Sequence, residues 1–210
     1  MRDTARDALR GELESFLNDP KTFMASNIVL PPQRVDTPDT KRPGSGIFQF
    51  SFLKAAAQAD KPIYRIDNPS EWNRDSGPRF MAYYCQYKSD RMYTLVLGDE
   101  MDIMLTPTMN GCSFGVGSEG SNGSRVVAHA NVSRQTSTPD GITQQGVTQA
   151  ELIGTKFSPQ TVFGPNDYLD NDVYGTTVGV RRNGHWAFFM QRWFRTTNTG
   201  YILKDIRDIA

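Results

Sequence analysis

One stretch of the chain, residues 105–133, holds its densest group of reactive side chains, LTPTMNGCSFGVGSEGSNGSRVVAHANVS. Cys112 and His129 both lie in it, and the chain has one further residue of each type, Cys85 and His185. A cysteine thiolate is a nucleophile, and a histidine can take the thiol proton and later deliver it to a leaving amine. These residue types predict a cysteine-dependent enzyme that attacks carboxamides through Cys112 and His129.

A β-hairpin would bring these two residues together. Short apolar runs flank the Gly/Ser-rich stretch GSEGSNGS, which is typical of two strands joined by a turn. With the turn centred between Gly120 and Ser121, Cys112 and His129 lie directly opposite each other, with Cβ atoms about 4.5–5.5 Å apart. The imidazole is then expected to hold the thiol as a thiolate. A slip of one residue would put the two side chains on opposite faces.

A third group must orient the imidazole of His129 in such a site. Thr106 is the first candidate, because its hydroxyl or carbonyl oxygen can accept a hydrogen bond from the ring N–H. Thr108, Asp102 and Asn131 lie near enough in the sequence to be alternatives. We therefore predict a catalytic group of cysteine, histidine and threonine.

Two further features could serve the same chemistry. A tight turn at Asn110-Gly111 could aim the main-chain N–H groups of Gly111 and Ser113 at an oxyanion beside the Cys112 sulfur. Trp72 lies in the polar segment NPSEWNRDSGP, where a large aromatic side chain is poorly explained as core. We expect Trp72 to line a substrate-binding surface.

The pattern T-x-x-x-x-G-C followed by a β-rich stretch and a histidine resembles the core of the cytotoxic necrotizing factor and CheD superfamily of glutamine deamidases, which includes the lethal factor of Burkholderia. The residues that carry the resemblance are Thr106, Gly111, Cys112 and His129. It implies a β-sandwich with flanking helices and a Cys-His pair, with a threonine or a carbonyl as third member, that converts a glutamine of a target protein to glutamate. The chain departs from the pattern at Asn110, where the toxins usually have serine.

The resemblance also implies a biological setting. It points to a bacterial toxin or secreted effector, made in the bacterial cytoplasm and secreted or injected into a host cell, without a metal or organic cofactor. The expected partner is a target protein that bears the modified glutamine, such as a host translation factor or a GTPase. Two alternatives stay open: a transglutaminase or cysteine protease with the same dyad, and a non-enzymatic β-sandwich binding module in which Cys112 and His129 are merely packed.

Composition narrows the other classes of function. The chain has 210 residues, with 23 basic and 23 acidic side chains and therefore no net charge. No global field attracts nucleic acid or an anionic membrane, so neither is an expected partner. The N-terminal residues lack the apolar core of a signal peptide, and no apolar run approaches the roughly 20 residues of a membrane span.

The chain is expected to be one α+β unit, a β-rich sandwich of mostly antiparallel strands with a few flanking helices. Its predicted parts are an N-terminal helical segment (1–30), a Pro/Gly-rich loop or linker (31–46) and a β-rich catalytic domain (47–210). Apolar spacing predicts a helix from Thr4 to about Asn18.

Alternating apolar runs predict the strands. An Asn183-Gly184 dipeptide predicts a hairpin between the last two, and residues 133–149 are polar enough to predict a loop. The expected strands are Ile47–Leu53, Pro62–Ile66, Arg79–Tyr87, Met92–Leu97, Met101–Leu105, Cys112–Val116, Arg125–Val132, Glu151–Phe157, Tyr174–Arg181 and His185–Phe194.

Overall fold

The computed structural model describes residues 2–35, 45–56, 59–68, 77–132, 139–169, 173–196 and 200–210, with side chains from residue 6 onward. Trp72 and most of the predicted linker lie outside these ranges. In chain order the described elements are α1 (Arg2–Asn18), α2 (Pro20–Ser26), β1 (Ile28–Leu30), β2 (Gly46–Ala55), β3 (Ile63–Asp67), β4 (Arg79–Tyr84), β5 (Arg91–Leu97), β6 (Ile103–Leu105), β7 (Ser113–Gly117), β8 (Arg125–Asn131), α3 (Pro139–Gly154), β9 (Pro159–Phe163), α4 (Pro165–Tyr168), β10 (Val173–Arg182), β11 (His185–Thr196) and β12 (Gly200–Asp208).

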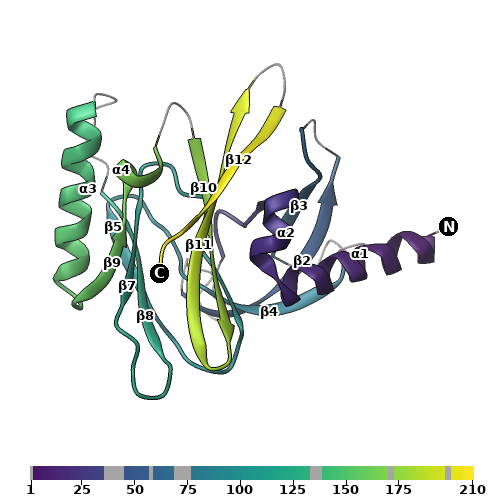
Figure 1. The fold of residues 1–210 in the computed structure, drawn as a ribbon, viewed down its shortest axis with the longest axis horizontal. Helices are drawn as coiled ribbons and strands as arrows, with labels where there is room; N and C mark the ends of the chain where they lie inside the picture. The colour runs from purple at the N-terminus through teal and green to yellow at the C-terminus, as the bar shows by residue number, and fades with distance from the viewer. Residues whose placement is uncertain are drawn as a thin grey trace.

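Within the described ranges the strands form two sheets. The large sheet has eight strands in the order β1-β3-β2-β4-β6-β10-β11-β12, and the small sheet has four in the order β5-β8-β7-β9. Neighbours pair antiparallel except β1 with β3 and β4 with β6. In Figure 1, α3 flanks the small sheet on one side of the molecule and α1 and α2 flank the large sheet on the other. The predicted fold class, a β-rich α+β fold, is confirmed.

The core between the sheets is apolar and draws on both of them, as alternation of side chains along each strand requires. It contains Tyr83, Met104, Phe188 and Met190 from the large sheet and Phe114, Val116, Val127 and Phe163 from the small one. Cys112 belongs to the same cluster. The candidate nucleophile therefore lies at the interface between the sheets.

The first two helices cover the other face of the large sheet. Phe16 of α1 stacks on Phe52 of β2 with ring centroids 5.6 Å apart, and Met24 of α2 is fully buried in the same cluster. Strand β1 then adds to the edge of the sheet beside β3. The predicted helix to Asn18 is confirmed. Leu13, Phe16 and Met24 of the two helices and Val29 of β1 belong to the same core cluster as residues of the large sheet.

The hairpin of β10 and β11 is confirmed with the register that its turn predicts. Arg182 pairs with His185 across a two-residue turn. Asn183 and Gly184 have φ values of 52° and 85°, the left-handed conformation that a type I′ turn requires at both positions. Local turn chemistry decided this part of the fold.

Two expectations about the segment after β8 are wrong. Residues 139–149, predicted as loop, and Glu151–Gly154, predicted as the start of a strand, together form helix α3. Its buried residues are Gln149 and Ile153, with Gln145 one turn earlier half-buried. Glutamines take inward-facing positions where apolar residues are usual, so the segment lacks the apolar periodicity that predicts an amphipathic helix. Strands β1, β9 and β12 were also not predicted.

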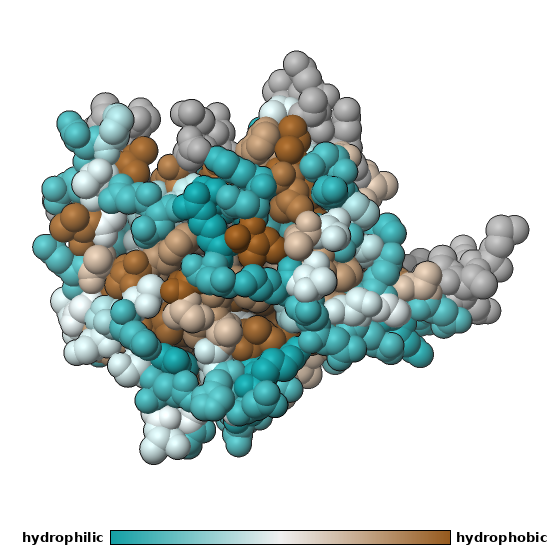
Figure 2. Space-filling view, in the orientation of Figure 1, coloured by the Kyte–Doolittle hydropathy of each residue, from teal (hydrophilic) through white to brown (hydrophobic). Residues whose placement is uncertain are grey.

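Apolar residues also reach the surface. Figure 2 shows them in the middle of one face of the molecule, between hydrophilic residues. Of the described large hydrophobic side chains, Met81, Val96 and Val147 are exposed. No helix in the described ranges is both long and apolar enough to cross a membrane.

Candidate functional site

Cys112 is one of the residues that line a surface pocket of about 350 Å³. It immediately precedes β7, and its side chain is 2% exposed. The pocket walls come from the segments after β1 and β4, the turn before β7 and strands β10 and β11. The lining residues are Gln33, Tyr87, Thr108, Asn110, Cys112, Tyr174 and Trp193. None of these described residues is of an acidic or basic type, so this part of the pocket suits a neutral polar group.

His129 and Thr106 meet across the interface between the two sheets. Thr106 follows β6 of the large sheet and His129 lies in β8 of the small sheet. The hydroxyl oxygen of Thr106 is 2.5 Å from Nδ1 of His129 and donates to the carbonyl oxygen of Cys85 at 2.9 Å. Both side chains are buried. Packing of one sheet on the other therefore places these two side chains in contact.

These contacts determine which ring nitrogen of His129 carries the proton. A hydroxyl has a single hydrogen, and that of Thr106 is directed at the Cys85 carbonyl. Thr106 must then accept from Nδ1–H, which leaves Nε2 without a proton in the neutral ring. Nε2 is buried and has no hydrogen-bond partner among the described atoms. The imidazole therefore presents an unused lone pair, which is the form that a general base needs.

The hairpin of β7 and β8 forms, but its predicted register is wrong. His129 pairs with Phe114 rather than with Cys112, a shift of two residues. The shift arises because the turn is built around Gly123, whose φ is +76°, and the Asn122 side chain, which accepts from Ser124 N–H at 3.1 Å. An even shift keeps side chains on the same face, so Cys112 becomes a diagonal neighbour of His129. A hydrogen bond from the thiol to Nε2 is not formed in this conformation.

The predicted thiolate is also not supported. Burial raises the pKa of the Cys112 thiol to about 12, although the nearby main-chain N–H of Asn110 favours the thiolate and opposes this rise. Burial lowers the pKa of His129 to about 3. Removal from water penalises both charged forms. At neutral pH the pair is therefore a thiol and a neutral imidazole, and the proton must move when the sulfur attacks.

The main-chain donors near Cys112 differ from those predicted. The N–H of Gly111 donates to the hydroxyl of Tyr168 at 2.8 Å, so it does not point toward the sulfur. Ser113 begins β7, and its side chain donates to Gln149 Oε1 at 2.6 Å. The main-chain N–H of Asn110, by contrast, acts to lower the pKa of the Cys112 thiol. Of the predicted oxyanion donors, Gly111 is thus already engaged.

The remaining predicted residues are spread over the fold. Thr108 lines the pocket and accepts from Gln33 Nε2 at 2.8 Å. Asp102 is exposed just before β6, and Asn131 ends β8. Neither of these two is the partner of His129, a position that Thr106 occupies. The predicted role of Trp72 lies outside the described residues.

Sequence reasoning missed three groups around Cys112. Tyr168, Gln145 and Gln149 all bond the main chain at Gly111 or Cys112. Gln145 and Gln149 stood in a segment predicted as loop, and nothing near Tyr168 in the sequence signals such a role. Their contacts depend on how α3 and α4 pack beside β7.

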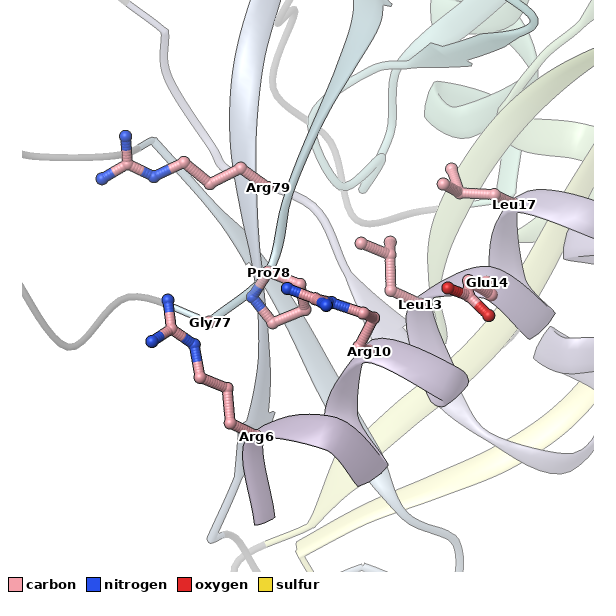
Figure 3. A pocket seen from close by; sticks show the side chains of 8 residues that line it. All are labelled: Arg6, Arg10, Leu13, Glu14, Leu17, Gly77, Pro78 and Arg79. Carbon is pink, nitrogen blue, oxygen red and sulfur yellow. The ribbon is translucent and has the colours of Figure 1, made fainter. Parts of the chain in front are cut away.

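A second hollow, of about 400 Å³, lies against α1 and is shown in Figure 3. Arg6 and Arg10 of the helix and Arg79 of β4 project around Gly77 and Pro78. Its described lining residues include no cysteine or histidine. Within the described ranges, no three His, Cys, Asp or Glu side chains gather as a metal site would require.

The depressed pKa of His129 predicts a pH-dependent stability. Its folded pKa is about 3, whereas an unfolded histidine titrates near 6.5. Between these values the unfolded chain binds a proton that the folded chain does not, so stability should fall as the pH drops below about 6.5. A His129→Gln variant should lose less stability than the wild type between about pH 7 and 4, by on the order of a few kcal/mol. Denaturant titrations at both pH values measure this difference, and equal losses would contradict the buried neutral ring.

Comparison with known proteins identifies no family for the chain. No protein-family model matches it, and no curated protein matches its sequence significantly. Among solved structures, the C-terminal domain of CNFy from Yersinia pseudotuberculosis is similar over 84% of this chain and 76% of that one, with a TM-score of 0.41 and 9% sequence identity. Similarity at this level does not establish a shared function, which must be inferred from the site itself.

Proposed function

We propose that the chain is a cysteine-dependent hydrolase that deamidates glutamine side chains of a target protein. One observation carries this proposal: Thr106 accepts from Nδ1–H of His129, and Nε2 is left without a partner among the described residues, on the hairpin face that also carries the pocket-lining Cys112. A buried ring nitrogen without a hydrogen-bond partner lowers the stability of the fold, so its presence calls for a functional explanation. Proton transfer from the Cys112 thiol, a diagonal neighbour across the hairpin, is the role that this arrangement favours.

Attack begins when Nε2 of His129 takes the Cys112 proton and the sulfur adds to the amide carbon. The C–S bond forms as the carbonyl π electrons move to oxygen, where main-chain N–H groups stabilise the oxyanion. Because the thiol and imidazole are both neutral beforehand, the step begins when Sγ and Nε2 come within hydrogen-bond distance of each other. Catalytic hydrogen bonds often shorten only in the substrate complex.

Collapse of the oxyanion breaks the C–N bond, and the imidazolium gives its proton to the departing amine, which leaves as ammonia. Water then attacks the thioester while His129 accepts its proton. The C–S bond breaks, the thiol regains its proton, and the glutamine has become glutamate. The hydrogen bond from Nδ1–H of His129 to the Thr106 hydroxyl keeps the ring oriented through acylation and hydrolysis.

The shape and polarity of the pocket favour a side-chain amide over a charged substrate. A volume of about 350 Å³ admits one extended side chain, and the lining residues are uncharged. The stacked rings of Tyr174 and Trp193, with centroids 4.8 Å apart, provide an apolar wall for the methylenes of a glutamine. A carboxylate product would find no cation among the described lining residues, which favours its release.

The motif resemblance further supports a role as a bacterial toxin or secreted effector that acts on a host protein. On this proposal the partner is a folded protein that offers a glutamine on its surface. A new negative charge at that glutamine would alter how the target binds its own partners. The same enzyme would not convert the glutamate back to glutamine.

The proposal can be tested by incubating a eukaryotic cell lysate with the wild-type chain in heavy-oxygen water and mapping modified peptides by mass spectrometry. Hydrolysis of a glutamine inserts one solvent oxygen, so enzymatic products carry the label. Labelled glutamate should appear at one or a few positions with the wild type and be missing with Cys112→Ser. Labelled new chain ends would instead indicate a protease, and glutamine–amine adducts a transglutaminase. Labelling that persists with Cys112→Ser would disprove the proposal.

A further inference from the structure

Three consecutive peptide groups around Cys112 are held by hydrogen bonds to side chains of α3 and α4. Tyr168 accepts from the N–H of Gly111 at 2.8 Å and donates to the carbonyl of Cys112 at 2.9 Å. Between these two contacts, the Gly111 carbonyl accepts from Nε2 of Gln145 at 2.8 Å and of Gln149 at 2.9 Å. No peptide plane from Asn110 to Ser113 is left without a side-chain anchor.

The middle peptide group has a consequence for catalysis. A trans peptide is planar, so the N–H of Cys112 points opposite to the carbonyl of Gly111. Because that carbonyl faces Gln145 and Gln149 of α3, the Cys112 N–H is directed away from the helix. An oxyanion forms on the carbon bonded to the Cys112 sulfur, and the nucleophile's own N–H can donate to it, as in serine proteases. The glutamines therefore determine where this donor points.

Such an anchor matters because Gly111 could otherwise let the peptide flip. Its φ is +88°, a conformation that a glycine adopts freely and from which it can leave freely. A flipped peptide would turn the Gly111 carbonyl, rather than an N–H, toward the developing negative charge. The two amide donors oppose this flip, and at least one of them is itself fixed.

Gln149 is fixed by Ser113. The Ser113 hydroxyl donates to Oε1 of Gln149 at 2.6 Å, and this contact orients the amide so that Nε2 faces Gly111. Ser113, Gln149 and Tyr168 are all buried, where an unsatisfied amide or hydroxyl is costly. Burial holds the pKa of Tyr168 well above its usual value, so its hydroxyl keeps the proton that it donates.

We infer that Gln149, oriented by Ser113 and assisted by Gln145 and Tyr168, is a positioning residue that aims the Cys112 N–H as an oxyanion donor. The inference rests on the proposed function, because it assumes that Cys112 attacks a carbonyl carbon. It assigns Gln149 a role in the stability of the transition state rather than in the reactivity of the thiol. Two small reagents separate these effects without knowledge of the target protein.

Iodoacetamide alkylates a thiol by direct displacement and forms no oxyanion. p-Nitrophenyl acetate acylates it through a tetrahedral oxyanion, with release of nitrophenolate. In Gln149→Met, which keeps side-chain volume and helix propensity, acylation of Cys112 should slow about 10- to 100-fold, less than the 10²–10³ for outright loss of an oxyanion donor. Alkylation should stay within about twofold, because direct displacement develops no charge for this donor to stabilise. Ser113→Ala should shift the ratio of the two rates in the same direction by less.

Gln191→Met is the matched control. Gln191 is also fully buried, accepts from Val29 N–H at 2.9 Å and donates to main-chain carbonyls, but it does not contact the Cys112 turn. It should lower stability without changing the ratio of acylation to alkylation. If the wild type is acylated at Cys112 but Gln149→Met leaves the ratio of acylation to alkylation unchanged, the role of Gln149 is overturned and the proposed function is not. A wild type that is not acylated at Cys112 would overturn the inference together with the proposed function.

Discussion

Cys112→Ala is expected to abolish glutamine conversion, with a loss of at least about 10⁴-fold in turnover. The reason is chemical: no other described thiol lines the pocket, and the reaction cannot form a thioester without one. The fold should persist, because removal of a single buried sulfur costs about 1 kcal/mol. Turnover can be followed as labelled glutamate in the target peptide, and stability by thermal unfolding of the same sample.

Cys85→Ala provides the matched control. Cys85 is likewise buried, and burial raises the pKa of its thiol to about 12 as well. The substitution removes the thiol but keeps the main-chain carbonyl that accepts from Thr106. Turnover should fall far less than in Cys112→Ala. Comparable losses in the two variants would mean that packing between the sheets, rather than a nucleophile, explains the effect.

His129→Ala is expected to lower turnover by about 10²–10⁴-fold, the range for loss of a general acid and base. Because the thiol pKa is about 12, little thiolate exists near neutral pH without a base to take the proton. His129 does not line the pocket, so substrate binding should change little and the loss should appear in kcat rather than in KM. Steady-state kinetics on the mapped target peptide measure the two separately.

Two companion variants sharpen this result. Thr106→Val keeps the shape of the side chain but leaves Nδ1 of His129 without its partner, so it should also lower kcat, by less than His129→Ala. His185→Ala changes the other histidine, an exposed residue 2.6 Å from Glu119, and should have no effect. A loss in His185→Ala, or none in Thr106→Val, would contradict the assignment of the base and its orienting partner.

Both sheets contribute residues to the site. The large sheet supplies Thr106 just after β6, whereas the small sheet supplies His129 in β8 and the turn that carries Cys112. Helix α3 reaches that turn from the outer face of the small sheet through Gln149. A site assembled in this way depends on the packing of the sheets, because neither sheet holds a complete set of groups.

Residue types and local spacing were sufficient for much of the fold. Alternating apolar runs predicted β2 to β8, β10 and β11, and the Asn183-Gly184 turn predicted the hairpin. The same local signals failed for α3, because its inward face carries Gln145 and Gln149. Their amides are satisfied by the Gly111 carbonyl, a partner from another part of the chain that no local pattern reveals.

The sequence by itself determined which groups are available for the chemistry: two cysteines, two histidines, a threonine ahead of a Gly-Cys turn, and a β-rich chain to carry them. Tertiary structure decided how they meet. The turn at Gly123 gives β7 and β8 a register two residues away from the predicted one, and contact between the sheets joins Thr106 to His129. Exclusion of water raises the pKa of Cys112 to about 12 and lowers that of His129 to about 3. Each of these depends on distances and burial set by residues far apart in the chain, which spacing along the chain does not specify.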